Sequence, residues 1–360
     1  MKFYNYRVMN ERILTGITTT GIPHLGNFLG AIKPALEFQS TDNDTYFFLA
    51  DYHSIIKQQD PNLIIESVKS VAMAWLASGL DPNVSKIYRQ SDIPEITELQ
   101  WILNCVTAKG LMNRSHAYKD AVAKNIELNA DEDKSITMGL FSYPVLMSAD
   151  ILMFNANKVP VGNDQLQHLE MTRDIALRFN HIYGETFVIP EAIVNEDTKI
   201  IPGLDGRKMS KSYGNIIPLL SDEKTLNKAI KKIVTNSLEP GEPKEYENCN
   251  LFNIFSSFAD DQAINNMKQA YAEGIGWGDA KEQVFSYLNQ IILPIREKYF
   301  ELLEDKDFNE AFLFLRGSRG KYFGKQRLNT FFKNSKQIVG HLQIFIHLYE
   351  ILHTIYETKK

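Results

Sequence analysis

The chain has 360 residues, 44% of them hydrophobic, which provides enough apolar material for a sizeable core and suggests two domains. Its formal net charge of −5 argues against a protein that coats nucleic acid through a general positive field, so any nucleic-acid contact must be local. The chain has only two cysteines, far apart in the sequence, which argues against a disulfide framework and a cysteine-held metal site. It has no apolar run long enough to cross a bilayer, which argues against a membrane anchor. Residues 1–10 carry no secretory signal, and together these features favour the cytoplasm.

Short β-rich runs alternate with longer helical patterns over about the first 200 residues, which predicts a parallel sheet with crossover helices. Strands are expected over 12–16, 45–50, 86–89 and 158–161, and helices over 27–38, 66–78, 96–104 and from the 162–165 turn to 179. Asn163 or Asp164 is the expected N-cap of the last helix.

From residue 221 onward the patterns are nearly all helical. The predicted fold class is therefore α/β, with a Rossmann-like parallel sheet domain over 1–215 followed by an all-helical domain over 216–340. Apolar residues at helical spacing over 341–360 predict an amphipathic C-terminal extension.

The turn after the first predicted strand, Gly21 to Asn27, has the properties of an anion site. A glycine-relieved turn into a helix presents free backbone N–H groups and the helix dipole to a negative charge, and Gly26 lets a nucleotide approach the backbone. The side chains of His24 and Asn27 can then donate to phosphate oxygens. The alternative is an ordinary capped helix start with a surface histidine.

A second segment, residues 203–215, places Lys208 and Lys211 three residues apart between glycines. Mobile ammonium groups on such a loop can follow the negative charge that builds up on a departing pyrophosphate. Alone, this segment could be a solvated basic turn. Together with the turn around His24, it predicts a nucleotide clamp.

These two segments carry a resemblance to a known family. Residues 23–27 read like the first signature of the class I aminoacyl-tRNA synthetases, and residues 208–212 are identical to the second. The resemblance implies catalytic roles for Lys208, Lys211, His24 and Asn27, and further ATP contacts from Thr20, Gly26, Met209 and Ser210. One departure is the run of three threonines at 18–20, where many members have Gln-Pro-Ser; what replaces the missing amide contact is open.

Within class I, the chain resembles the bacterial-type tryptophanyl-tRNA synthetases over roughly residues 12–340. Residues 159–174 are close to that family's pattern, which implies that Asp164 contacts the ATP ribose and that Gln165 holds the ammonium of the amino acid. Both roles suit the chemistry, because a carboxylate accepts from two hydroxyls and an amide oxygen accepts from N⁺–H. Lys119 aligns with a third lysine on the ATP side.

The segment from Tyr143 to Asp150 is the most diagnostic of substrate. The resemblance implies that Tyr143 lies near the ammonium, Met147 against the ring and Asp150 at the indole N–H, which is a donor only and suits a carboxylate. Related tyrosyl enzymes typically have a glutamine where this chain has Met147. The resemblance also implies that His53, at the end of the second predicted strand, and Gly16 line the tryptophan pocket. A helix cap and a core histidine are the alternatives for Asp150 and His53.

The implied reaction has two steps. The carboxylate of L-tryptophan attacks the α-phosphorus of ATP and releases pyrophosphate, and the adenylate then esterifies the terminal ribose of tRNA(Trp). The nucleophile is already an anion, so positioning and charge stabilisation carry the catalysis, with Mg²⁺ on the phosphates and no metal ligand expected from the protein.

Seven basic residues and no acidic one lie between 316 and 336, interleaved with aromatic residues. They predict either local tRNA contact, within a helical anticodon-binding domain, or a solvated helix face. The family also implies a homodimer; no DNA or membrane partner is expected.

Three other functions remain open from sequence. Met147 disfavours a tyrosyl-tRNA synthetase, and the helical second half disfavours a small-molecule nucleotidyltransferase with the same His-x-Gly turn. The intact set of His24, Asn27, Lys208 and Lys211 disfavours a tRNA-binding paralogue without turnover.

Overall fold

Five parallel strands form the centre of the molecule. The computed structural model describes residues 11–194 and 201–306; the basic stretch at 316–336 and the extension at 341–360 lie outside the described residues. The strands are β1 (Arg12–Thr18), β2 (Asp44–Ala50), β3 (Lys86–Arg89), β4 (Lys158–Val161) and β5 (Glu191–Val194). Their order in the sheet is β3-β2-β1-β4-β5, with every neighbouring pair parallel. The predicted α/β class with a Rossmann-like sheet is confirmed.

The inner strands are apolar because both faces of the sheet are covered. β2 buries every residue from Thr45 to Ala50, and β1 pairs with it along its whole length, ending with Thr18 opposite Ala50. The four predicted strands are confirmed, whereas β5, an edge strand without a buried residue, was not predicted. The strand order changes direction between β1 and β4, so ligands are expected outside the carboxyl ends of these two strands.

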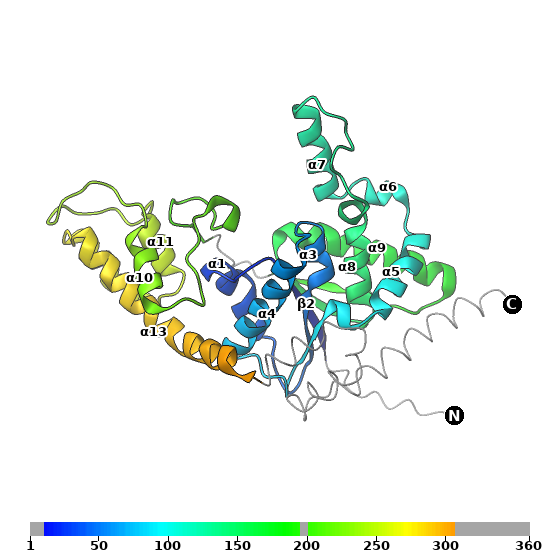
Figure 1. Cartoon of the computed structure of the whole chain (residues 1–360), viewed down its shortest axis with the longest axis horizontal. Coiled ribbons are helices and arrows are strands. Elements are labelled where there is room, and N and C mark those ends of the chain that lie inside the picture. Colours follow the sequence, from blue (N-terminus) through cyan, green and yellow to red (C-terminus); the bar gives the residue numbers. More distant parts are fainter. Residues whose placement is uncertain (1–10, 195–200, 307–360) are drawn as a thin grey trace.

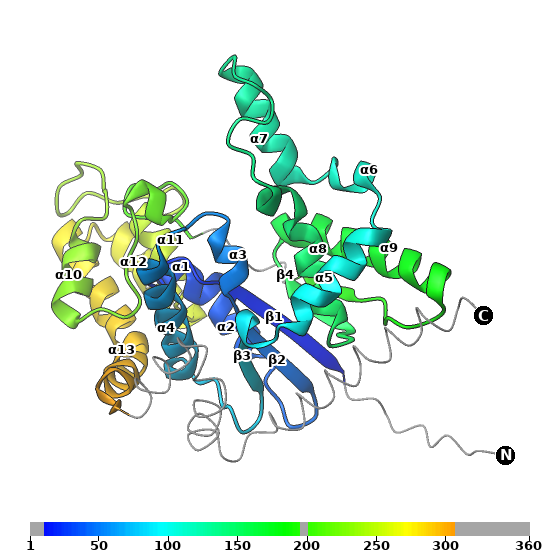
Figure 2. The same cartoon turned by 45° about the vertical axis from the view of Figure 1, so that its right-hand side comes forward.

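Helices on the two faces of the sheet create two hydrophobic cores (Figure 1). One face carries α4 (Pro61–Ala77) and a continuous helical run of α1 (Leu25–Asn27), a π-helical turn (Phe28–Ile32) and α2 (Lys33–Leu36). The other face carries α5 (Glu95–Val106), α8 (Met138–Leu152) and α9 (Leu166–Tyr183). Figure 2 shows α4 and α5 on opposite sides of the strands.

Capping explains why α4 begins at Pro61 and not at residue 66. The side chain of Asp60 accepts hydrogen bonds from the backbone N–H groups of Asn62 and Leu63. Proline is favoured in the first turn, where its missing N–H costs nothing.

The predicted N-cap of α9 at Asn163 or Asp164 is wrong. The N-cap of α9 is Gln165, the last residue of a 3₁₀ turn over Asn163–Gln165 that itself follows Gly162. The Asp164 carboxylate accepts from the side-chain amide of Gln165 at 3.0 Å, so it is bound to its neighbour's side chain and not to the backbone.

The second half of the described chain is helical, as predicted, with α10 (Glu223–Lys231), α11 (Asn250–Ser256), α12 (Asp261–Ala272) and α13 (Trp277–Glu304). α13 packs against α4 (Figure 1). Their buried side chains belong to the same core as Phe47 and Leu49 of β2. The helical part is therefore fastened to one face of the sheet by a continuous core.

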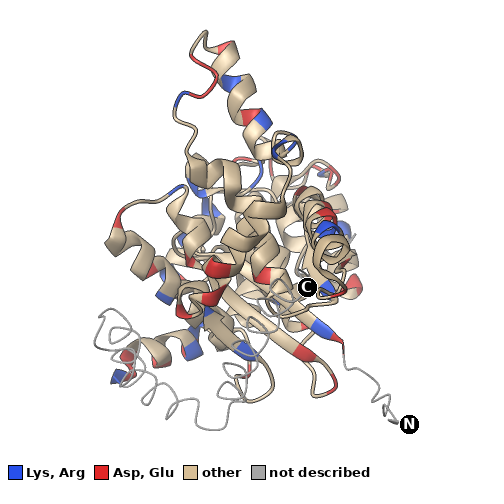
Figure 3. Ribbon diagram, turned by 90° about the vertical axis from the view of Figure 1, so that its right-hand side faces the viewer, with Lys and Arg blue, Asp and Glu red and all other residues tan. Residues whose placement is uncertain are grey.

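A projection, which we call the arm, consists of α6 (Lys109–Met112), α7 (His116–Glu127) and the loop to Thr137. It extends away from the sheet in both views (Figures 1 and 2), and α7 buries none of its residues. Positively and negatively charged residues are interspersed along the ribbon of the arm and of the body (Figure 3). Within residues 11–194 and 201–306, no helix has both the length and the apolar character needed to cross a membrane.

Candidate active site

His24 caps the helix that follows β1. Its Nδ1 accepts a hydrogen bond from the backbone N–H of Asn27 at 3.3 Å, and the side-chain oxygen of Asn27 accepts one from the backbone N–H of His24 at 3.1 Å. Burial, and then the charge of Lys211, lower the pKa of His24 to about 4, so the ring is neutral at physiological pH. Because Nδ1 is an acceptor, the ring proton is on Nε2, which is left to donate to a ligand.

Two glycines of the predicted site lie in close contact with neighbouring side chains. A Cβ atom on Gly26 would lie 3.0 Å from Nδ1 of His24, so glycine leaves room for the capping ring. A Cβ atom on Gly16 would lie 2.3 Å from the ring of Phe48, so glycine determines where that ring lies beside β1. The contacts of Gly26 with ATP and of Gly16 with tryptophan stay predictions.

The loop that carries Lys208 and Lys211 lies against the turn around His24. The ammonium of Lys211 donates to the carbonyl oxygen of Thr20. Partial burial lowers the pKa of Lys211 to about 8. The structure thus brings together the two segments that the sequence analysis paired, as a nucleotide clamp requires.

The chain that leaves this loop pairs with the same turn. The backbone N–H of Leu25 donates to the carbonyl of Ile217 at 2.9 Å, and the N–H of Leu219 donates to the carbonyl of Pro23 at 3.2 Å. These bonds fix the end of the lysine loop beside the capping histidine.

Asn215 holds the lysine loop together from the inside. Its Oδ1 accepts from the backbone N–H of Ser210 at 2.8 Å, and its Nδ2 donates to the carbonyl of Lys208 at 3.1 Å and to Asp205 Oδ1 at 2.7 Å. A Cβ atom on Gly203 would lie 2.4 Å from this side chain, so glycine is needed there. The sequence analysis treated Asn215 only as a boundary; its one signal was its place at the end of the glycine-rich segment.

The predicted ATP contacts in the loop differ in their environment. Met209 is buried in the core, and its backbone N–H donates to the carbonyl of Ile201 at 3.0 Å. Ser210 Oγ lies 2.7 Å from Ser212 Oγ, and Lys208 is exposed. Met209 therefore anchors the loop from which Lys208 projects, and their contacts with ATP stay predictions.

The three threonines at the end of β1 have different environments. Thr19 is buried, and both its N–H and its hydroxyl bind Ser54 Oγ in α3 (Asp51–Ile55), at 3.0 and 2.8 Å. Thr18 and Thr20 are exposed. Only Thr18 and Thr20 are therefore placed to substitute for the amide that many family members have here.

Tyr143, Met147 and Asp150 share one face of α8, because their spacing of four and three residues matches the helical period. α8 is fixed to α9 by a 2.9 Å hydrogen bond between Ser148 Oγ and Thr172 Oγ1. Tyr143 and Met147 are partly exposed, whereas Asp150 is fully buried. The face runs from a partly exposed tyrosine to a buried aspartate.

The carboxylate of Asp150 is held by two side chains. His53 Nε2 lies 2.9 Å from Oδ2, and Gln90 Nε2 donates to Oδ1 at 2.8 Å and to Oδ2 at 3.0 Å. Burial raises the pKa of Asp150, and the contact with His53 opposes that shift. Asp150 lies inside α8 and caps no helix, so the alternative of a helix cap is wrong.

Gln90 was missed by the sequence analysis. It follows β3 directly, and its Oε1 accepts from the backbone N–H of Tyr52 at 3.1 Å. Its place at the carboxyl end of a predicted parallel strand was the available signal.

Tyr143, His168, Gln165 and Asp164 form a chain of hydrogen bonds. Tyr143 Oη lies 2.6 Å from His168 Nε2, and His168 Nδ1 lies 2.9 Å from Gln165 Oε1. Gln165 Nε2 donates to Asp164 Oδ2 at 3.0 Å. The predicted ribose ligand and the predicted ammonium ligands are therefore connected through His168, to which the sequence analysis gave no role.

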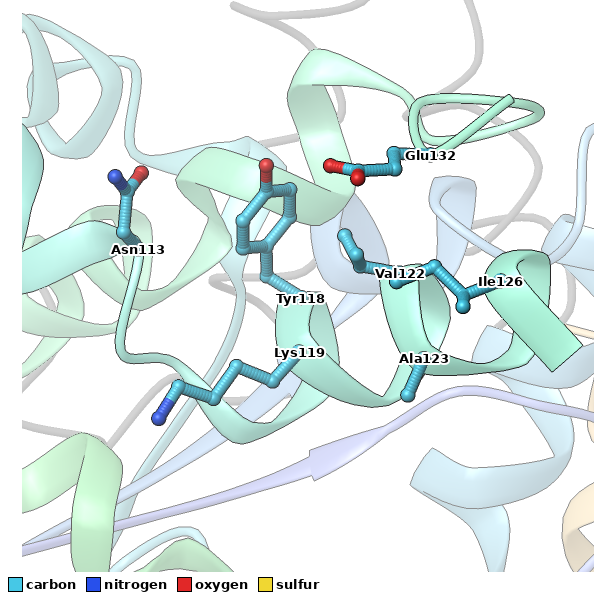
Figure 4. A pocket seen from close by; sticks show the side chains of 7 residues that line it. All are labelled: Asn113, Tyr118, Lys119, Val122, Ala123, Ile126 and Glu132. Carbon is cyan, nitrogen blue, oxygen red and sulfur yellow. The ribbon is translucent and has the colours of Figure 1, made fainter. Parts of the chain in front are cut away.

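Lys119 lies on the arm, apart from the turn that carries His24 (Figure 1). It lines an open pocket of about 320 Å³ with Asn113, Tyr118, Val122, Ala123, Ile126 and Glu132. Figure 4 shows the Lys119 side chain extending away from Glu132. The structure does not bring Lys119 to the other predicted ATP ligands in this conformation, and its ATP contact stays a prediction.

Comparison with protein families gives one match that covers most of the chain. Residues 9–292 match the family described as tRNA synthetases class I (W and Y). The chain is 52% identical over 313 residues to the tryptophan–tRNA ligase of Xanthomonas axonopodis pv. citri, a match that spans 86% of this chain and 72% of that one. It is 54% identical over 309 residues to the same enzyme of Pseudomonas aeruginosa, spanning 85% and 69%.

A solved structure shows the same similarity in three dimensions. The tryptophanyl-tRNA synthetase of Campylobacter jejuni, crystallised with ADP and tryptophan, superposes with a TM-score of 0.75 at 41% sequence identity. The match covers 89% of this chain and 98% of that one.

Proposed function

The chain belongs to the class I tRNA synthetases of the tryptophan and tyrosine family, and we propose that it activates L-tryptophan with ATP and transfers it to tRNA(Trp). It is an ATP-dependent aminoacyl-tRNA ligase. Relatives that are more than half identical over most of the chain carry this activity in their names, and the structural relative binds ADP and tryptophan.

The buried carboxylate of Asp150 is the observation that best supports tryptophan as the substrate. It lies at the inner end of the face that also carries Tyr143 and Met147. Gln90 occupies one position on Oδ1, and a carboxylate oxygen has two lone pairs, so Oδ1 retains one for the indole N–H. Met147 offers an apolar surface to the ring, which disfavours tyrosine because its hydroxyl needs a polar partner.

The clamp of His24, Asn27, Lys208 and Lys211 supports the activation step. The carboxylate of tryptophan is already a nucleophile, so it needs no general base when it attacks the α-phosphorus in line. Neutral His24 donates through Nε2–H, and Lys211 leaves Thr20 to follow the charge on the pyrophosphate. These groups would stabilise the transition state more than bound ATP.

Mg²⁺ is proposed to arrive with ATP. Among the described residues, no group of three His, Cys, Asp or Glu side chains is arranged to hold a metal ion. Mg²⁺ commonly binds substrate phosphates and keeps several waters, so the phosphates suffice to carry it. Its contribution is to neutralise charge on the phosphates during transfer.

The remaining assignments rest on the family. We propose that tRNA(Trp) contacts the helical domain, including the stretch at 316–336, and that the protein is a cytoplasmic homodimer. The exposed side chain of Trp101 on α5, 71% accessible, is compatible with a contact between subunits. Light scattering after size-exclusion chromatography measures the assembly.

Pyrophosphate exchange with each of the twenty amino acids tests the proposed activation. We expect exchange that depends on tryptophan and ATP and is far weaker with tyrosine. Exchange driven by tyrosine alone would identify a tyrosyl enzyme, and no exchange with any amino acid would contradict the ligase assignment.

A further inference from the structure

His168 is a buried histidine beside the amino-acid pocket that the proposed reaction does not use. Its side chain is 4% exposed, and both ring nitrogens have partners: Nε2 the Tyr143 hydroxyl and Nδ1 the Gln165 amide oxygen. The hydroxyl of Thr172 donates to its backbone carbonyl at 2.9 Å and also contacts Ser148 of α8. The ring is thus fixed between the two helices that form this wall.

Asp164, at one end of the hydrogen-bonded series that includes His168, determines the direction of each hydrogen bond. The Asp164 carboxylate only accepts, so Gln165 must turn its NH₂ group toward it, as the 3.0 Å contact shows. The amide oxygen of Gln165 then faces His168 Nδ1, which must carry the ring proton. A neutral imidazole has one proton, so Nε2 is an acceptor.

The consequence falls on Tyr143. Because Nε2 of His168 is an acceptor at 2.6 Å, the Tyr143 hydroxyl donates its only hydrogen to His168. The Ser115 hydroxyl also contacts Tyr143 and can donate to one lone pair of its oxygen. The other lone pair can accept from a ligand, and the hydroxyl cannot donate to one. An ammonium group has three N–H donors and no acceptor, so it matches an oxygen prepared in this way.

We propose that His168 is a positioning residue that fixes the Tyr143 hydroxyl as a pure acceptor for the ammonium group of the amino-acid substrate. The proposal rests on the proposed function, because it assumes an α-amino acid in this pocket. It assigns His168 no contact with the substrate. It also connects Tyr143 and Gln165, the two predicted ammonium ligands, through one imidazole ring.

The same geometry makes the site sensitive to acid. A protonated His168 donates from both nitrogens, so the Tyr143 hydroxyl would have to accept and would turn its hydrogen toward the ammonium. The titratable groups that face His168 are His116 at the start of α7, Asp164, His53 and Tyr143. Burial and then His116 hold the pKa of His168 below its ordinary value, which keeps the acceptor form at neutral pH.

The first experiment compares two ligands on His168→Phe by titration calorimetry at pH 7.5. Phenylalanine keeps a ring in the space but accepts nothing from Tyr143. Indole-3-propionate has the indole and carboxylate of tryptophan and lacks the ammonium. We expect tryptophan to bind about 10-fold to 100-fold more weakly than to wild type, and indole-3-propionate to bind equally to both. His181→Phe, at an exposed position of the same helix, is the matched control and should change neither affinity.

Equal loss for both ligands would mean that His168 only supports the wall, and unchanged tryptophan binding would also overturn the proposal. Failure of wild type to bind tryptophan at all would instead refute the proposed function. In His168→Gln, an amide oxygen replaces the acceptor, so partial recovery of tryptophan binding is expected.

Wild type provides a test that needs no folded His168 variant. As the pH is lowered from 7.5 over the range in which the protein stays folded, tryptophan affinity should fall once His168 takes up a proton, at a pH below the ordinary pKa of histidine. Tyr143→Phe should lose that part of the pH dependence. Identical pH profiles for wild type and Tyr143→Phe would contradict the proposal.

Discussion

The ammonium of Lys211 donates a hydrogen bond to the carbonyl oxygen of Thr20, and this contact closes the second signature loop on the first. The same ammonium is proposed to bind phosphate oxygens of ATP. Within residues 11–194 and 201–306, no carboxylate forms an ion pair with Lys211, so none of these groups competes with the leaving group for its charge.

Replacing either Lys208 or Lys211 should slow adenylate formation and leave the binding of tryptophan unchanged. We expect Lys208→Ala and Lys211→Ala each to reduce the rate of adenylate formation by roughly 10²–10³, because each ammonium acts mainly on charge that develops in the transition state. Rapid-quench measurement of the single-turnover rate, with a separate tryptophan titration, checks this. Lys224→Ala, exposed on α10, is the control and should behave as wild type. A variant altered only in its tryptophan dissociation constant would contradict the role.

The pKa of Lys211 predicts an alkaline limit. Burial lowers that pKa to about 8, so the ammonium is present below pH 8 and is lost as the pH rises through 8. kcat/KM for ATP reports the free enzyme and should fall above this pH. Lys211→Arg keeps its charge, so its profile should stay level to higher pH even if its rate is lower. If kcat/KM for ATP falls at the same alkaline pH in wild type and in Lys211→Arg, the fall is caused by a group other than Lys211.

His24 can be tested without loss of its capping role. Asparagine is a favoured N-cap, so His24→Asn should keep the acceptor for the Asn27 N–H while removing the Nε2–H donor. We expect a melting temperature close to that of wild type and a drop of roughly 10² or more in the activation rate. Thermal melting and pyrophosphate exchange, measured on the same preparation, separate the two functions. Normal exchange would show that the histidine is only a cap.

Asp150 should make tryptophan recognition depend on the indole N–H. Methylation of that nitrogen leaves the buried carboxylate without its ligand donor, which costs roughly 1–3 kcal/mol. Wild type should therefore discriminate against 1-methyltryptophan. Asp150→Ala should raise the KM for tryptophan and reduce discrimination against phenylalanine. The KM for ATP should change little in this variant. Equal use of tryptophan and 1-methyltryptophan by wild type would remove Asp150 from this role.

Much of the fold could be predicted because it depends on local patterns. Apolar runs and turn residues located four strands, and the alternation with helices predicted the parallel sheet. The edge strand β5 was missed because it is only four residues long, and its apolar run of Ala192, Ile193 and Val194 is too short to identify a strand by its pattern. The start of α4 was missed because a cap at Asp60, outside the apolar pattern, determines it.

The site was predicted only as far as its motifs extend. Resemblance located Asp150 and Tyr143, but the partners that orient them, Gln90 and His168, come from other elements of the fold. Neither pairing leaves a periodicity or spacing in the sequence, because the folded chain alone brings the residues together. The placement of Lys119 on the arm likewise depends on tertiary structure.

The most direct measurement is the identity of the amino acid that the protein attaches to tRNA. The purified chain, total tRNA, ATP, Mg²⁺ and an equal mixture of the twenty amino acids are incubated, and the esterified amino acid is released and identified by mass spectrometry. We expect tryptophan as the dominant product, dependent on ATP and absent with Lys211→Ala on the same time scale. Tyrosine as the dominant product, or no esterified amino acid at all, would contradict it.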